Sequence, residues 1–254
     1  MMLGAHLTPR ARACIEQADV VFAAVSDALV ELWLQEMHPD VRSLQPLYAE
    51  GRPRIQTYRA MSEAMLIELR AGRSVCGAFY GHPGVFALAP HLAMKQARAE
   101  GFHAHMEPGI SAEDCLYADL EIDPGDYGCQ HYEASQFMFH RRRVDTSACL
   151  ILWQVGIAGD RSMSRFSTGA GHRALLVDAL LEQGYPPDHG VIVYEAATSP
   201  LAPVPRIEKC RLQDLADVDL RLQTTLVLPP ASAKELDGGM QARLAAIESA
   251  NSGK

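Results

Sequence analysis

Residues 74–86, SVCGAFYGHPGVF, decide the fold class of this chain. The first seven residues form a short, mostly apolar run that predicts a buried strand. The run ends in a turn, Gly81-His82-Pro83-Gly84, after which a helix is predicted to about Glu100. Because glycine lacks a side chain, main-chain groups in such a turn can approach a ligand closely. The stretch therefore predicts a strand, a binding turn and a helix in succession.

The same alternation of strand and helix extends outward in both directions. Thr8 followed by Pro9 is typical of a helix start, with threonine as the N-cap. Short apolar strands separated by amphipathic helices predict a parallel sheet covered by helices on both faces. The predicted helices cover residues 9–18, 27–37, 54–71 and 85–100, with one more opened by Ser111, and the predicted strands cover residues 20–25, 74–80 and 102–108.

After about residue 125 the predicted strands lie closer together, which indicates a second α/β domain with a mixed sheet. The expected domains are residues 1–125, residues 126–230, and a C-terminal helix with its tail over residues 231–254. In the second domain the predicted strands cover residues 129–135, 148–156, 190–196, 206–212 and 224–230, with a helix at residues 171–183.

Composition excludes several classes of protein. The chain has 254 residues, 48% of them hydrophobic, and a formal net charge of −8, which disfavours a nucleic-acid partner. The basic run at residues 141–143 is interpreted as a solvated helix end. Since no stretch has the ~20 apolar residues of a membrane span, and the N-terminus lacks the apolar core of a signal peptide, a cytoplasmic protein without membrane contact is expected. Six cysteines show no CxxC spacing, and His103 and His105 alternate on a predicted strand, so no metal site is expected.

Three loops carry candidate chemistry at predicted strand ends, where ligands bind in parallel sheets. The first is the turn at residues 80–86. The second, residues 108–115 (PGISAEDC), opens a helix whose free amides, with Ser111, suit a ligand carboxylate. The third contains Arg54 and Tyr58, four residues apart on one helical face, a pair that suits a reaction developing negative charge on a carbonyl-like group. The motifs GxxxxGK[ST] and GxGxxG are absent, which disfavours phosphate-loop and dinucleotide sites.

Together, the segments PRIQTY, YGHPGVF, PGISAEDC, CQHYEAS and WQVGIAGD resemble the tetrapyrrole methylase superfamily, and more closely the borosin peptide backbone N-methyltransferases. The resemblance runs from about Thr8 to about Pro230. It implies two α/β domains with S-adenosylmethionine (SAM) in the cleft between them, a homodimer, and α-N-methylation of a ribosomally made precursor peptide. In that family the precursor is fused to the enzyme or separate. The tail here, LAAIESANSGK, favours a separate precursor acting in trans, and a heterotetramer of enzyme and precursor stays open beside the homodimer.

The resemblance also assigns roles to individual residues. Arg54, Tyr58, Tyr80 and Tyr48 correspond to catalytic positions. The expected cofactor contacts are Tyr80, His82, Pro83, Val85, Phe86, Ser111, Ala112, Ala134, Gln154 and the turn Ala197-Thr198-Ser199-Pro200. We expect Arg54 and a tyrosine hydroxyl to stabilise the oxygen of a deprotonated amide, and a tyrosine with a depressed pKa to take the proton.

Two features depart from the family pattern. The family opens with a strand and a glycine-rich turn, whereas this chain begins MMLGAHLTP, so that strand is expected to be absent or reduced to a stub. The tyrosine expected three residues before Tyr48 is Gln45. Two alternatives therefore stay open: a corrin or porphyrin C-methyltransferase, and a catalytically impaired peptide-binding subunit.

Overall fold

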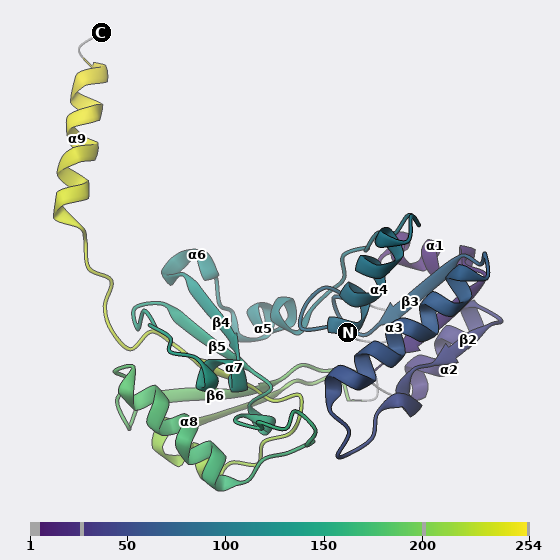
Figure 1. Cartoon of the computed structure of the whole chain (residues 1–254). Helices are drawn as coiled ribbons and strands as arrows, with labels where there is room; N and C mark the ends of the chain where they lie inside the picture. Colours follow the sequence, from purple (N-terminus) through teal and green to yellow (C-terminus); the bar gives the residue numbers. More distant parts are fainter. Residues whose placement is uncertain (1–5, 26–27, 200–201, 253–254) are drawn as a thin grey trace.

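The computed structural model describes residues 6–25, 28–199 and 202–252, which form two α/β halves side by side (Figure 1). In the first half, the described strands make one parallel sheet in the order β2-β1-β3. Its strands are β1 (Val20–Ala24), β2 (Val41–Ser43) and β3 (Val75–Phe79), and its helices are α1 (Pro9–Gln17), α2 (Ala28–Met37), α3 (Arg54–Arg70) and α4 (Leu88–Ala99).

The strand β1 is the centre of this half because every one of its residues is buried. One face packs against α3, where Phe22 meets Met61 and Met65. The other face packs against α1 and α2 through Ile15 and Leu34. Thr8 caps α1 by accepting a hydrogen bond from the amide of Ala11, as its sequence position predicts.

The second half contains a mixed sheet in the order β4-β5-β8-β6-β7, in which only the β4–β5 pair is parallel. The mixed sheet predicted from sequence is therefore confirmed. Its strands are β4 (Cys129–Glu133), β5 (Cys149–Trp153), β6 (Gly190–Glu195), β7 (Arg206–Arg211) and β8 (Thr225–Leu228). The remaining helices are α5 (Ala112–Leu120), α6 (Pro124–Tyr127), α7 (Ala134–Phe139), α8 (Ala170–Glu182) and α9 (Gly238–Ser252), with 3-10 turns η1 (Gln45–Leu47), η2 (Val155–Ile157) and η3 (Leu212–Asp217).

The helix α5 packs on the second sheet, not the first. Its buried Leu116 contacts Ile151 and Tyr194, and the Tyr194 hydroxyl donates to Asp119 at 2.7 Å. The domain boundary predicted at residue 125 stays a prediction, but this packing brings residues from Ala112 onward into the second half.

Several sequence predictions were wrong in detail. Residues 102–108 form no strand, because none of the described strands pairs with them through main-chain hydrogen bonds. Residues 134–139 form α7 where a strand was expected to continue to residue 135, and the C-terminal helix begins at Gly238 rather than residue 231. The short strand β2 was not foreseen. The expectation of a missing opening strand falls on residues 1–5, outside the described residues.

Among the described residues, no helix combines the length and apolarity that crossing a bilayer requires.

Candidate functional site

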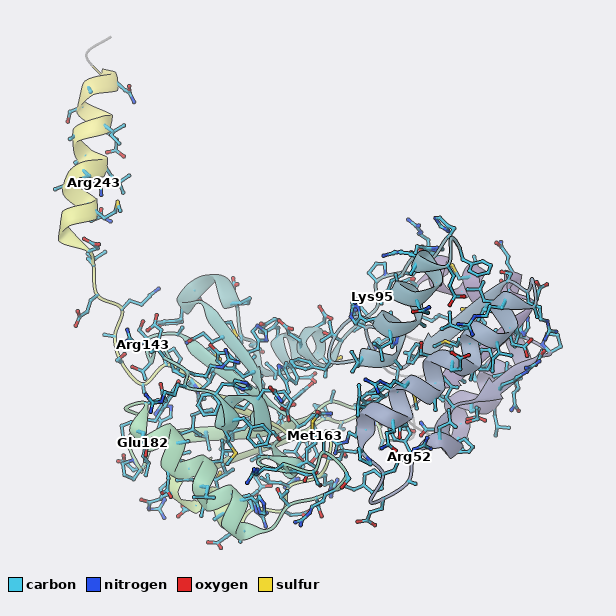
Figure 2. The ribbon with its side chains drawn as sticks, in the orientation of Figure 1. Arg52, Lys95, Arg143, Met163, Glu182 and Arg243 are labelled. Atoms are coloured by element: carbon cyan, nitrogen blue, oxygen red, sulfur yellow. The ribbon has the colours of Figure 1, made fainter. Side chains whose placement is uncertain are left out.

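Arg54 joins the two halves of the molecule. It is the first residue of α3, directly after Pro53 as N-cap. Its amide donates to the main-chain oxygen of Met163 at 3.0 Å, and its guanidinium Nη2 donates to the main-chain oxygen of Arg165 at 2.6 Å. Figure 2 shows Met163 and Arg52 at the same junction. The permanent positive charge of Arg54 therefore lies where α3 meets a loop of the second half.

Three tyrosines surround this charge. Tyr48 and Tyr58 pack edge to face with ring centres 6.5 Å apart, and Tyr80 follows the end of β3. Arg54 acts electrostatically on all three phenols, and each shifts the pKa of another. The structure thus brings together the four residues that the sequence proposed as catalytic.

The expected direction of the tyrosine pKa shift is wrong. Burial raises the pKa of Tyr48 and Tyr58 above the ordinary value, and the opposing effect of Arg54 is smaller. The pKa of Tyr80 is raised for the same reason, although 54% of this residue is exposed and water screens it more. Desolvation is the larger effect because a phenolate in these apolar surroundings loses more hydration energy than it gains by electrostatic attraction to one guanidinium. All three phenols are therefore hydrogen-bond donors at neutral pH.

Gln45, which stands where the family pattern has a tyrosine, is used differently. It begins η1, and its side-chain amide donates to the main-chain oxygen of Val25 at the end of β1. Its role in the structure is to hold that strand end.

The two glycine turns predicted to form one site do touch. A Cβ added to Gly109 would lie 2.5 Å from the main-chain oxygen of Gly81, a distance at which no side chain fits. In the first turn the amide of Gly84 donates to His82 Nδ1 at 3.0 Å, and Val85 donates to the oxygen of His82. Phe86 follows with φ +49°, a left-handed conformation that is uncommon for a bulky residue.

Ser111 is the N-cap of α5, and its polar groups are engaged in hydrogen bonds within that helix start. It forms a capping box, in which its hydroxyl accepts from the amide of Asp114 and its own amide donates to the Asp114 carboxylate at 2.6 Å. Burial would raise the pKa of Asp114, but these hydrogen bonds lower it. A carboxylate at this helix start competes with a ligand carboxylate, so the expected ligand role of Ser111 is weakened while the amide of Ala112 remains beside the site.

Trp153, which the sequence did not indicate as a site residue, borders the candidate site from the second half. Trp153 ends β5 and packs between Phe86, with ring centres 5.7 Å apart, and His131, at 6.4 Å. Its indole N–H is buried and has no hydrogen-bond partner among the described residues. A buried donor without a partner is costly, and this one lies beside the turn at residues 81–86, where it is available to an acceptor.

The other expected cofactor residues come from the second half. Gln154 follows Trp153 in a left-handed conformation with φ +59°, and Ala134 is fully buried at the start of α7. Ala196, directly before Ala197, packs in the same apolar cluster as Trp153 and Ala112. Thr198 and Ser199 continue this segment, whereas Pro200 lies outside the described residues.

Asp160 organises the loop that holds Arg54. It is 4% exposed, and its carboxylate accepts from the Ser162 hydroxyl and from the amides of Ser162, Ser164 and Arg165. Burial acts to raise its pKa, but these hydrogen bonds lower the pKa to about 2. A buried carboxylate so well satisfied stays ionised and fixes the loop.

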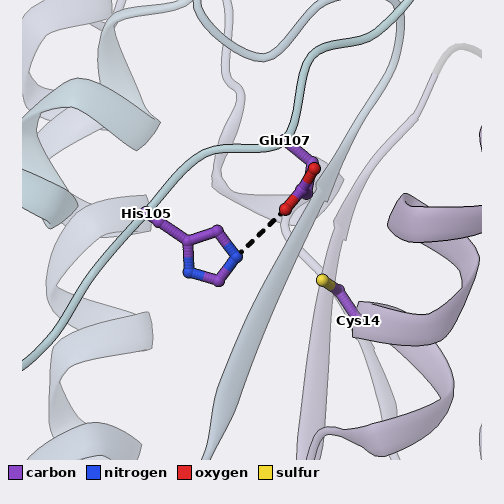
Figure 3. A group of neighbouring side chains, drawn as sticks. All are labelled: Cys14, His105 and Glu107. Atoms are coloured by element: carbon purple, nitrogen blue, oxygen red, sulfur yellow. Dashed lines mark ion pairs between the residues drawn. The ribbon is translucent and has the colours of Figure 1, made fainter.

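A second polar cluster lies elsewhere in the first half. Cys14 on α1, with His105 and Glu107, brings one thiol, one imidazole and one carboxylate within 4.8 Å of one another (Figure 3). Glu107 is already paired with Arg10 at 2.8 Å. The cluster borders a cavity beside β3 and is not part of the Arg54 site.

Proteins of similar sequence share one description, a methyltransferase joined to a ribosomally synthesized cyclic peptide precursor. The chain is 43% identical over 231 residues to a methyltransferase/ribosomally synthesized type I borosin cyclic peptide precursor of Coprinopsis marcescibilis, covering 89% of this chain and 59% of that protein. It is 38% identical over 233 residues to the corresponding omphalotin A precursor of Omphalotus olearius, covering 90% and 55%. The chain thus spans somewhat more than half the length of these relatives, whose names join a methyltransferase and a precursor in one protein.

Solved structures share the fold. A uroporphyrin-III-C-methyltransferase of Thermus thermophilus matches with a TM-score of 0.62 at 19% identity, covering 91% of each chain. Another structure of uroporphyrin-III C-methyl transferase from this organism, complexed with S-adenyl homocysteine, matches with a TM-score of 0.55 at 17% identity, covering 88% of this chain and 91% of that one. The sequence also matches the family Tetrapyrrole (Corrin/Porphyrin) Methylases over residues 3–216. The two sheets, their order and this match show that the chain belongs to the tetrapyrrole methylase family.

Proposed function

We propose that this chain is a SAM-dependent methyltransferase that methylates backbone amide nitrogens of a ribosomally made peptide supplied on a separate chain. The observation that carries the proposal is the permanent charge of Arg54 among three protonated phenols, beside the two glycine turns. The names of the relatives, which pair methyltransferases with cyclic peptide precursors, favour a peptide over a tetrapyrrole as substrate.

The residues present fit SAM as cofactor. The close contact between Gly81 and Gly109 leaves main-chain groups accessible, and the unpartnered Trp153 N–H adds a buried donor next to Phe86. The residues proposed to hold the cofactor are His82, Pro83, Val85, Phe86, Ala112, Trp153 and Gln154. When bound, SAM supplies an electrophilic methyl group on a sulfonium that leaves as a neutral thioether.

The rest of the chemistry belongs to the chain. An amide nitrogen is a poor nucleophile because its lone pair is delocalised into the carbonyl, so it must first lose its proton. The resulting imidate carries its charge largely on oxygen, and Arg54 with a phenol O–H stabilises that oxygen. One such preorganised donor typically contributes about 3–4 kcal/mol.

A phenolate is the proposed proton acceptor. Since the pKa of each tyrosine is raised, only a small fraction is ionised at neutral pH, and each pH unit below the pKa costs about 1.4 kcal/mol. The phenolate gained in this way is a stronger base than one with a depressed pKa, which suits a proton as weakly acidic as that of an amide.

We also propose that the chain works as a homodimer. On α9, Met240, Leu244 and Ile247 are exposed and spaced four and three residues apart, so they share one helical face. This helix stands away from the two halves (Figure 1), which supports packing against a second polypeptide. Light scattering should give the mass of a dimer, and Leu244→Lys should lower it.

The function is tested by mass spectrometry of candidate precursor peptides, encoded beside this chain's gene, after incubation with the protein and SAM. Mass gains of about 14 Da that fragment onto backbone nitrogens support the proposal. A co-purified tetrapyrrole absorbance would instead favour a C-methyltransferase. Peptide binding without any SAM binding in calorimetry would favour an impaired subunit.

A further inference from the structure

Two cysteines lie side by side where β4 and β5 begin. Cys129 and Cys149 are paired in register in this parallel pair of strands, so their side chains lie on the same face of the sheet. That face packs against Leu116 of α5. Neighbouring strands lie about 4.8 Å apart, and the Cα atoms of a disulfide are usually about 4.4–6.8 Å apart. The two thiols, both free in the structure, are therefore at a separation that a disulfide can span.

Polar side chains from β4 and α5 surround the thiol of Cys129. His131 lies two residues further along β4, on the same face, and forms a hydrogen bond with this thiol. His131 Nε2 lies 3.4 Å from Glu113 Oε1, and the Tyr117 hydroxyl donates to the same oxygen at 2.9 Å. A thiol beside an imidazole that a carboxylate orients is the arrangement that activates a sulfur nucleophile.

These contacts decide which of the two sulfurs loses its proton. Hydrogen bonds from Cys149, His131 and Tyr117 lower the pKa of Cys129, although burial opposes them. The hydrogen bond with Cys129 raises the pKa of Cys149, and burial adds to that rise. The pKa of His131 is raised by Cys129, and also by the charge of Glu113. Cys129 is therefore the thiolate beside an imidazolium, whereas Cys149 keeps its proton.

Exposure gives the two sulfurs different access to solvent. Cys149 is 4% exposed, whereas Cys129 is only half-buried. The side chains of His131 and Glu113, which border Cys129, are each 28% exposed. A small reagent from solvent therefore reaches Cys129 first, and Cys149 lies behind it in contact. Redox-sensitive cysteines typically combine such an accessible, ionised thiol with a second, resolving thiol beside it.

We propose that Cys129 and Cys149 form a redox site at which a small hydroperoxide, such as hydrogen peroxide, is reduced and a reversible disulfide closes. The proposed methylation uses neither these two thiols nor His131, Glu113 or Tyr117, so this inference does not depend on it.

The reaction takes two steps and consumes one peroxide. The Cys129 sulfur attacks one peroxide oxygen, the O–O bond breaks, and the leaving hydroxide takes a proton from His131 to become water. The Cys149 thiol then attacks the sulfenic sulfur of Cys129, the S–O bond breaks, and the hydroxide leaves as water with the Cys149 proton. Each thiol gives up one electron, and the peroxide takes both.

The test is peptide mass spectrometry of the full chain, reduced first and then treated with a small excess of hydrogen peroxide. Samples taken over time are quenched with N-ethylmaleimide. Cys210 of β7 is the internal standard, because burial and the carboxylates Glu208 and Asp214 raise the pKa of this half-buried thiol. Cys129 should be oxidised about tenfold faster than Cys210, with a Cys129–Cys149 bridge as the product and full reversal by dithiothreitol.

Variants test the role of each group. In Cys149→Ser the reaction should stop at the sulfenic acid of Cys129, which dimedone traps. His131→Gln removes the charge beside Cys129 and should slow its oxidation about tenfold, whereas His140→Gln at an exposed position should not.

Three results would overturn the proposal. The first is oxidation of Cys129 in the unaltered protein that is no faster than oxidation of Cys210. The second is a bridge from Cys129 to a cysteine other than Cys149. The third is a Cys149→Ser protein that gives no dimedone adduct at Cys129. The first two need no variant, so a substitution that impairs folding does not protect the proposal.

Discussion

The Arg54 guanidinium of α3 donates to the main-chain oxygen of Arg165 at 2.6 Å, across 111 positions of the chain. This hydrogen bond makes the proposed catalytic cation part of the junction between the two halves. The loop that accepts this hydrogen bond is held by the buried carboxylate of Asp160, which itself accepts hydrogen bonds from the amides of Ser164 and Arg165. The position of the charge therefore depends on residues of both halves.

Replacing Arg54 should remove the stabilisation of the imidate oxygen. We expect Arg54→Ala to lower the rate of peptide methylation about 100- to 1,000-fold with SAM affinity changed little, as on loss of one oxyanion donor. The rate is measured from the mass gain of the peptide and the affinity by calorimetry. Arg59→Ala, on the exposed side of the same helix, is the matched control. Full methylation by Arg54→Ala would show that the mechanism is wrong.

The raised tyrosine pKa values predict an alkaline pH profile. If a phenolate takes the amide proton, kcat/KM should rise about tenfold per pH unit from pH 7 to 9, because the ionised fraction grows that fast below the pKa. Tyr80→Phe should slow methylation at every pH and leave SAM affinity largely intact. A profile that is flat over this range would exclude a tyrosine as the base.

The contact between the two glycine turns predicts a sharp effect of a single methyl group. Gly109→Ala places a Cβ 2.5 Å from the Gly81 oxygen, so the turns must separate, at a cost of about 1–3 kcal/mol. We expect a lower melting temperature and weaker SAM binding by calorimetry. Gly169→Ala, whose Cβ meets nothing within 4 Å, should change neither. Unchanged SAM affinity in Gly109→Ala would separate these turns from the cofactor site.

Asp160 predicts a link between pH and stability. Its pKa is lowered to about 2 in the folded protein. Its contribution to the free energy of unfolding is therefore complete above the ordinary carboxyl pKa of about 4 and is lost as pH falls toward 2. Asp160→Asn should lower the free energy of unfolding at pH 7 by about 1–3 kcal/mol. It should also reduce the further loss of stability that the protein shows as pH falls toward 2. Urea titrations at pH 3 and pH 7 measure both effects, with exposed Asp178→Asn as the control. Equal loss of stability at the two pH values would contradict the assignment.

The sequence by itself determined the local elements and the pieces of the site. Apolar runs predicted β1, β3 and the strands of the mixed sheet, and Thr8 and Ser111 predicted two helix starts, because these signals depend on neighbouring residues alone. The resemblance also selected Arg54 and the three tyrosines that the fold gathers around it. Tertiary structure decided the rest. Residues 102–108 alternate like a strand yet form none, because a strand needs a hydrogen-bonded neighbour. The tyrosine pKa values rise because burial, which spacing does not reveal, outweighs the charge of Arg54. Trp153 and Asp160 gain their roles only through contacts with segments far away in the chain.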